Sequence, residues 1–165
     1  MKPVLDTEKE YGLVLEGGGA KGAYQIGAWK ALKEAGIRIK GIAGTSVGAL
    51  NGALICMGDL EKAESLWENI SYSQIMSVDD KVMEDIFKQK KISRDALKDM
   101  MDYISAGGVD ITPLKELIAE CVDEEKIQNS SMDLYIHTFS VDEMRDLNVD
   151  LKGIEPELIK DFLLA

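Results

Sequence analysis

A chain of 165 residues with 45% hydrophobic content can bury one substantial core but is too short for two full domains. Its formal net charge of -11 has the wrong sign for a general nucleic-acid binder or a polybasic membrane patch. No apolar run reaches the roughly 18 residues that a membrane-spanning helix needs, and the polar start shows no secretory signal or transit peptide.

Both cysteines lie in apolar helical contexts. Cys56 follows Ala-Leu-Ile, and Cys121 follows Leu-Ile-Ala-Glu. Such surroundings are more typical of buried thiols than of a disulfide framework or a metal site. We therefore expect a reducing, cytoplasmic location.

The N-terminal third contains two successive strand–turn–helix patterns. A short apolar strand runs into a glycine loop and a periodic helix, and the same order then repeats around a second small-residue turn. Two such units predict a parallel sheet covered by helices. The expected elements are a strand at Tyr11–Glu16, a helix at Ala23–Ala35 ended by Gly36, a strand at Ile37–Ala43 and a helix ending near Met57.

The rest of the chain predicts further helices and one hairpin. Between Ser71 and Ser105, short amphipathic helical pieces carry several methionines, which we expect to face a core; a mobile, lipid-touching lid is the alternative. Thr112 is expected to cap a helix with Pro113 in its first turn. The methionines are Met76, Met83, Met100 and Met101. The other helices are expected at Asp59–Ile70, Leu114–Val122 and Pro156–Ala165, with a break at Gly107–Gly108. The hairpin is expected to consist of strands at Leu134–Val141 and Asp146–Leu151 around a turn at Glu143–Arg145.

The pentapeptide Gly44-Thr45-Ser46-Val47-Gly48 matches the pattern Gly-x-Ser-x-Gly of a nucleophile elbow. It stands between a predicted strand and a predicted helix, where a tight turn pushes the serine hydroxyl out of the sheet end. Flanking glycines remove side chains that would collide there, and the helix N-terminus adds positive potential. The motif predicts Ser46 as a nucleophile; the alternative is a small-residue turn in which Ser46 only caps its helix.

The glycine loop from Gly17 to Gly22 can supply backbone N–H donors to a developing oxyanion without side-chain obstruction. It also satisfies Gly-x-Gly-x-x-Gly, the fingerprint of dinucleotide-binding sites. That fingerprint normally has an acidic residue at the end of the second strand, where this chain has Gly44-Thr45-Ser46. The sequence therefore disfavours a dinucleotide site.

The two motifs, in this order, resemble the bacterial branch of the patatin-like phospholipase family. The segment from Asp110 to Leu114 is similar to the one that introduces a helix in this family. The resemblance implies a three-layer α/β/α fold with a mainly parallel sheet and an enzyme that hydrolyses acyl esters of lipids without metal or organic cofactor. It implies that Gly17, Gly18 and Gly19 form the oxyanion hole and that Ser46 attacks the ester carbonyl. Lys21, on the same glycine loop, is implied to be a structural or head-group charge.

The resemblance also implies a Ser-Asp dyad whose aspartate lies in an Asp-Gly-Gly/Ala motif, and the sequence contains no such motif. We therefore expect residues 1–165 to be the N-terminal portion of a single patatin-like domain, C-terminally incomplete, with its general base beyond Ala165. Alternative bases within the chain are His137, the only histidine, and carboxylates that are more typical of turns, surfaces or structural roles, namely Glu16, Asp110, Asp142, Asp146 and Asp150.

The expected partners follow from the same resemblance. They are a phospholipid or another acyl-ester lipid, a membrane surface in peripheral contact and, through an incomplete sheet, a second copy of the chain; nucleic acid is not expected. Two other functions stay open. The chain could be an inactive or lipid-binding remnant, or an acyltransferase of the malonyl-transferase kind, which would want histidine where Thr45 stands.

Overall fold

The computed structural model describes residues 5–77, 80 and 110–164. By their contacts these form two units, residues 5–68 with 122–164, and the described part of 69–121. The first unit contains the sheet and both glycine motifs. The expected methionine-rich pieces beyond Ser77 and the break at Gly107–Gly108 lie outside the described residues.

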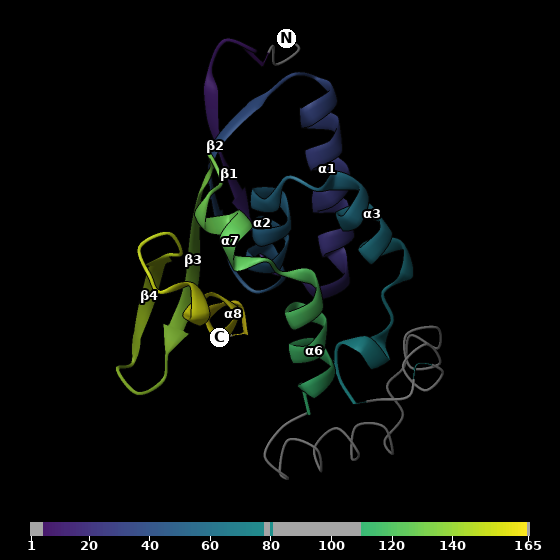
Figure 1. The fold of residues 1–165 in the computed structure, drawn as a ribbon, viewed down its shortest axis with the longest axis vertical. Coiled ribbons are helices and arrows are strands. Elements are labelled where there is room, and N and C mark those ends of the chain that lie inside the picture. The colour runs from purple at the N-terminus through teal and green to yellow at the C-terminus, as the bar shows by residue number, and fades with distance from the viewer. Residues whose placement is uncertain (1–4, 78–79, 81–109, 165) are drawn as a thin grey trace. The chain divides into compact units, whose positions relative to one another are not determined.

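A four-stranded sheet organises the first unit, with its strands in the order β1-β2-β3-β4 (Figure 1). The first two neighbouring pairs are parallel and the last is antiparallel. The predicted α/β class with a mainly parallel sheet is thereby confirmed. The strands are β1 (Glu10–Leu15), β2 (Arg38–Gly44), β3 (Asp133–Ser140) and β4 (Arg145–Asp150).

Helices α1, α2, α3 and α6 begin and end close to the predicted bounds, whereas α7 was not predicted and the helix predicted from Pro156 is α-helical only from Ile159. In the first unit the glycine loop contains a short 3-10 turn, and the chain ends in a 3-10 turn followed by a short α-helix. Within the described residues, the helices fall short of the length and apolarity that a bilayer crossing requires. The helical elements are η1 (Gly19–Lys21), α1 (Gly22–Glu34), α2 (Val47–Met57), α3 (Leu60–Asn69), η2 (Tyr72–Gln74), α6 (Thr112–Cys121), α7 (Glu124–Gln128), η3 (Pro156–Leu158) and α8 (Ile159–Leu164).

The core forms where α2 packs against β1, β2 and β3 (Figure 1). Its sequence, VGALNGALICM, is apolar around most of its circumference, and most of its residues are buried. Gly52 allows this close approach, since a β-carbon there would lie 2.9 Å from the Leu134 side chain and 3.2 Å from that of Ile42. On β3, Leu134 and Ile136 point to this core, whereas Tyr135 and Phe139 are exposed on the opposite face.

Helix α6 begins earlier than its predicted start. The helix predicted to start at Leu114 with Thr112 as its cap instead begins at Thr112. The carboxylate of Asp110 accepts the Thr112 N–H at 2.9 Å, so an aspartate two residues earlier satisfies the helix start.

The cysteine prediction is confirmed, because Cys56 and Cys121 are buried thiols. Burial raises the pKa of Cys56 to about 11.

Candidate active site

Ser46 occupies a sharp turn between the end of β2 at Gly44 and the start of α2 at Val47. Its backbone has φ 53° and ψ -131°, a positive-φ conformation that favours glycine and is rare for a residue with a side chain. Ser46 is exposed, and the Thr45 N–H bonds the carbonyl of Leu15 at 3.2 Å. The serine is thus held in a strained turn at the carboxyl end of the parallel strands.

The glycines on either side of this turn have no room for a side chain. A β-carbon on Gly44 would lie 2.5 Å from the Gly48 carbonyl carbon and 2.7 Å from the Ala49 nitrogen. A β-carbon on Gly48 would lie 2.7 Å from the Leu15 carbonyl carbon and nearer still to its oxygen. Because these neighbours are backbone atoms, the turn can be this tight only with glycine at position 44, and α2 can start this close to β1 only with glycine at position 48.

The glycine loop lies directly against Ser46. A β-carbon on Gly17 would be 3.2 Å from the Cβ and 3.7 Å from the Oγ of Ser46. Gly18 and Gly19 follow with φ 150° and 55°, conformations that turn the backbone out of the strand path. The structure therefore brings the two predicted motifs together at one edge of the sheet.

Several N–H groups of the glycine loop and the elbow have no acceptor among the described residues. They belong to Gly17, Gly18 and Gly19 of the loop and to Val47, the residue after the serine. Backbone N–H groups at a loop and a helix start are the usual donors of an oxyanion hole. Lys21 shapes the same loop, since its N–H bonds the Gly18 carbonyl at 3.2 Å and its side chain lies beside Gly18.

A polar network behind the loop was not predicted from the sequence. Asn51, 1% exposed, donates to the carbonyl of Gly22 at 2.9 Å and to Oε1 of Gln25 at 2.8 Å. The indole N–H of Trp67 donates to Oδ1 of Asn51 at 2.8 Å. The signal in the sequence was a single amide inside the otherwise apolar helix α2, because a buried polar group needs partners.

His137 lies on β3 one residue beyond Ile136, which pairs with Gly44 of β2. Its Nδ1 is 3.0 Å from Oδ1 of Asn148, and its Nε2 is 3.9 Å from Oδ1 of Asp146. No hydrogen bond between His137 and Ser46 is present in the described part of the chain. The histidine therefore interacts with the β3–β4 hairpin.

The remaining carboxylates of the sequence analysis lie at turns or on the surface. Asp150 accepts the Lys152 N–H in the turn after β4, and the exposed Glu16 contributes its backbone carbonyl to Gln25. Hydrogen bonds from Thr112, first its hydroxyl and then its N–H, lower the pKa of Asp110. Asp142 and Asp146 are exposed at the hairpin. In the residues that the structure describes, His, Cys, Asp and Glu form no cluster of three or more able to hold a metal ion.

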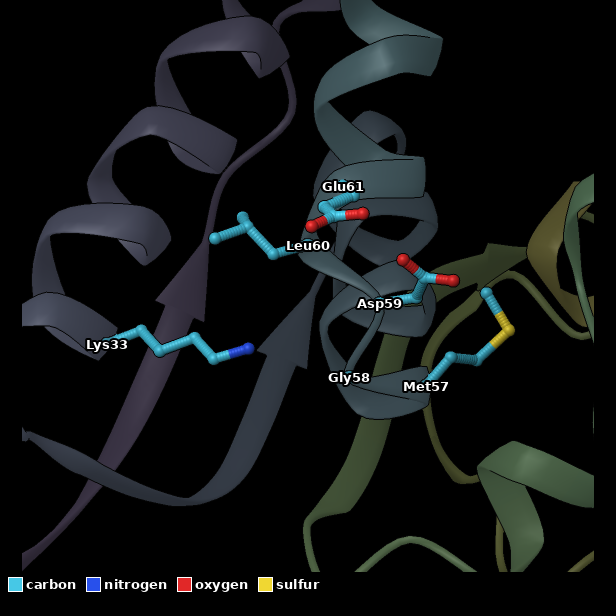
Figure 2. Close-up of a pocket in the computed structure, with 6 residues that line it drawn as sticks. All are labelled: Lys33, Met57, Gly58, Asp59, Leu60 and Glu61. Carbon is cyan, nitrogen blue, oxygen red and sulfur yellow. The ribbon is translucent and has the colours of Figure 1, made fainter.

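A shallow cavity of about 460 Å³ lies at the other end of α2 (Figure 2). Met57 and Gly58, which end this helix, belong to its lining, whereas Ser46 precedes the first residue of the helix. The 11 residues of α2 span about 16 Å. The cavity is thus remote from the elbow and contains none of the predicted site residues; its lining is Lys33, Met57, Gly58, Asp59, Leu60 and Glu61.

A mainly parallel sheet, an exposed serine on a strained strand-to-helix turn and a glycine loop against it define the α/β class of proteins with a nucleophile elbow. The family model "Patatin-like phospholipase" matches residues 13–165. The chain belongs to the patatin-like phospholipase family, as its motifs predicted. This membership supports a carboxylic ester hydrolase as the enzyme class.

Individual relatives match a shorter segment. The chain is 63% identical over 46 residues to lysophospholipase nte1 of Aspergillus terreus, covering 28% of this chain and 3% of that protein. It is 58% identical over 50 residues to neuropathy target esterase sws of Drosophila persimilis, covering 30% and 4%. The match therefore spans only a small part of the length of these curated relatives.

A solved structure supports the fold independently. The crystal structure of VipD from Legionella pneumophila superposes with a TM-score of 0.56 at 14% identity, covering 92% of this chain and 41% of that one. At this identity the similarity shows the fold alone. It agrees with the predicted patatin-like architecture.

Proposed function

We propose that this chain supplies the nucleophile and the oxyanion loop of a lipid acyl hydrolase acting on phospholipids, lysophospholipids or related acyl esters. The observation that carries the proposal is the contact between the two motifs. Ser46 stands at φ 53° on an exposed turn, and Gly17 of the glycine loop lies against its side chain. Family membership and the names of the relatives support a lipid ester as substrate.

In the proposed reaction, Oγ of Ser46 forms a bond to the ester carbonyl carbon while its proton passes to a general base. The N–H groups of Gly17, Gly18 and Gly19 stabilise the negative oxygen of the tetrahedral intermediate. Collapse of the intermediate breaks the bond to the leaving alcohol, which takes the proton, and leaves an acyl-Ser46 ester. Water then attacks this ester with the same base, releasing the fatty acid and restoring the hydroxyl.

The general base is proposed to be the aspartate of a Ser-Asp dyad supplied from outside residues 1–165. Resemblance to the family supports this proposal, and so does chemistry. A serine hydroxyl without a base is a weak nucleophile, and assistance by a general base raises the reaction rate roughly 10²-fold to 10⁴-fold. His137 is the alternative base. It follows Ile136, which pairs with Gly44 at the end of β2, and so lies near the elbow along the sheet. The proposed mechanism uses no cofactor. Peripheral membrane contact, self-association and a cytoplasmic location of the protein stay predictions.

The test is covalent labelling with a hydrophobic fluorophosphonate, followed by peptide mapping. In the full-length protein we expect the adduct on Ser46 and not on Ser65 or Ser71, with phospholipid or p-nitrophenyl ester turnover lost in Ser46→Ala. A label elsewhere, or turnover that survives in Ser46→Ala, contradicts the proposal. Lipid binding without label or turnover would favour the alternative of a non-catalytic lipid-binding protein. A matched His137→Ala variant decides between the two bases, because only the histidine mechanism requires its imidazole.

A further inference from the structure

The two ends of the glycine loop are fixed by side-chain amides. The loop follows Glu16 and runs into Gly22 at the start of α1. The carbonyl of Glu16 accepts a hydrogen bond from Nε2 of Gln25 at 2.8 Å, and the carbonyl of Gly22 accepts one from Nδ2 of Asn51 at 2.9 Å. Because Nδ2 of Asn51 also donates to Oε1 of Gln25 at 2.8 Å, one continuous chain of hydrogen bonds joins both ends.

The orientation of these amides is determined by their partners. Asn51 uses both hydrogens of its NH₂ group, and its Oδ1 accepts the indole N–H of Trp67. Rotating the amide by 180° would set oxygen against the Gly22 carbonyl and two N–H donors against each other. With Asn51 fixed, Gln25 must turn Oε1 toward it, which leaves Nε2 for Glu16.

The same residues connect the loop to the elbow. Asn51 lies on α2, five positions after Ser46. A β-carbon on Gly22 would be 2.6 Å from the Trp67 ring and 2.7 Å from Cγ2 of Val47, so the end of the loop packs onto the residue that follows the serine. A displacement of either amide is therefore transmitted to the spacing between the loop and Ser46.

We propose that Gln25 and Asn51, with Trp67 behind them, are positioning residues that fix the oxyanion loop relative to Ser46. This inference rests on the function proposed above. The amides touch no reacting atom; they act through the loop backbone, whose N–H groups must be placed accurately for the transition state. A misplacement of about 1 Å can lower a rate by roughly 100-fold, so their loss should reduce kcat more than substrate binding.

The decisive variant is Gln25→Met, which keeps the length of the side chain, adds no charge and removes both the donor to Glu16 and the acceptor for Asn51. Gln128→Met is the matched control, since Gln128 is also half-buried and its Nε2 donates to two backbone carbonyls, those of Leu151 and Ile154. Both changes remove hydrogen bonds to backbone carbonyls, but only one of the two glutamines bonds to the glycine loop.

The full-length protein and both variants are compared by the rate of fluorophosphonate labelling at Ser46, by kcat and KM, and by melting temperature. We expect Gln25→Met to lower the labelling rate and kcat roughly tenfold to 100-fold with KM within about a factor of two. Gln128→Met should keep the wild-type rates at a similar loss of melting temperature. Equal rates in Gln25→Met and wild type, or equal losses in the two variants, would overturn the positioning role. If the wild-type protein is not labelled at Ser46, the proposed function itself fails.

Discussion

Two glycine-rich turns meet at the carboxyl edge of the sheet, and they need glycine for different reasons. In the elbow, Gly44 and Gly48 lie so close to neighbouring backbone that a β-carbon has no space. In the loop, a β-carbon on Gly19 would meet nothing within 4 Å, but the residue has φ 55°. The elbow is thus limited by excluded volume and the loop by backbone conformation.

This difference matches what each turn has to do in the proposed reaction. Close packing at Gly48 fixes the start of α2 against β1, and with it the position of Ser46. Gly18 and Gly19 have positive φ, and their N–H groups have no acceptor in the described part of the chain. A fixed nucleophile and unpaired backbone donors are separate requirements, so substitutions in the two turns should fail in separate ways.

The largest effect is expected for Gly48→Ala. Its methyl group would overlap the Leu15 carbonyl, and backbone cannot move aside as a flexible side chain can. We expect the free energy of unfolding to fall by about 3 kcal/mol or more, together with loss of Ser46 labelling. Urea unfolding followed by circular dichroism measures the change. A variant as stable as the wild type would show that excluded volume does not limit the elbow.

Local sequence patterns were enough to predict the strands, the glycine-rich turns and the helices of this region. Strand, glycine turn and apolar helix occur in order, so the sequence alone predicts both motifs. Their meeting was predictable in outline, because the carboxyl ends of parallel strands share one edge of a sheet. The contact between Gly17 and Ser46 required the register of β1 with β2, which no local pattern contains.

The Asn51 network could not be predicted, for a related reason. A lone asparagine in an apolar helix shows that a partner must exist, but Gln25 and Trp67 lie 26 and 16 residues away in sequence. Only the packing of α1, α2 and α3 brings them together. The predicted capping residue of α6, Thr112, was wrong. Asp110 and Thr112 both suit a helix start, and in the structure the Asp110 carboxylate accepts the hydrogen bond.

The second prediction compares Ser46→Gly with Ser46→Ala. Ser46 holds φ 53° and ψ -131°, and such strain costs about 1 to 3 kcal/mol. Glycine relieves this strain at an entropic cost of about 0.5 to 1 kcal/mol, whereas alanine keeps it. Ser46→Gly should therefore unfold at higher urea concentration than Ser46→Ala, and neither should be labelled. Equal stability of the two would mean that the elbow is not strained.

The third prediction tests conformation in the loop with Gly19→Ala and Gly19→Asn. A β-carbon at Gly19 has open space, so the cost comes from positive φ, about 1 to 2 kcal/mol for alanine. Asparagine tolerates this conformation better and should recover part of the loss. The stability order wild type, Gly19→Asn, Gly19→Ala in urea unfolding is the expected result. If the larger asparagine is the worse of the two, the loop is limited by volume, as the elbow is.

The smallest effect is expected at Gly27, where neither reason for glycine applies. Gly27 lies within α1, is exposed, has no positive φ, and a β-carbon there would meet nothing within 4 Å. Alanine has the higher helix propensity, so Gly27→Ala should raise the free energy of unfolding by about 0.5 to 1 kcal/mol. For a chain of this size the melting temperature should rise by about 1 to 4 °C, with labelling at Ser46 unchanged. A loss of stability in Gly27→Ala would show that open space and ordinary φ do not suffice for a glycine to tolerate substitution. Excluded volume and backbone conformation would then not explain why Gly48 and Gly19 require glycine.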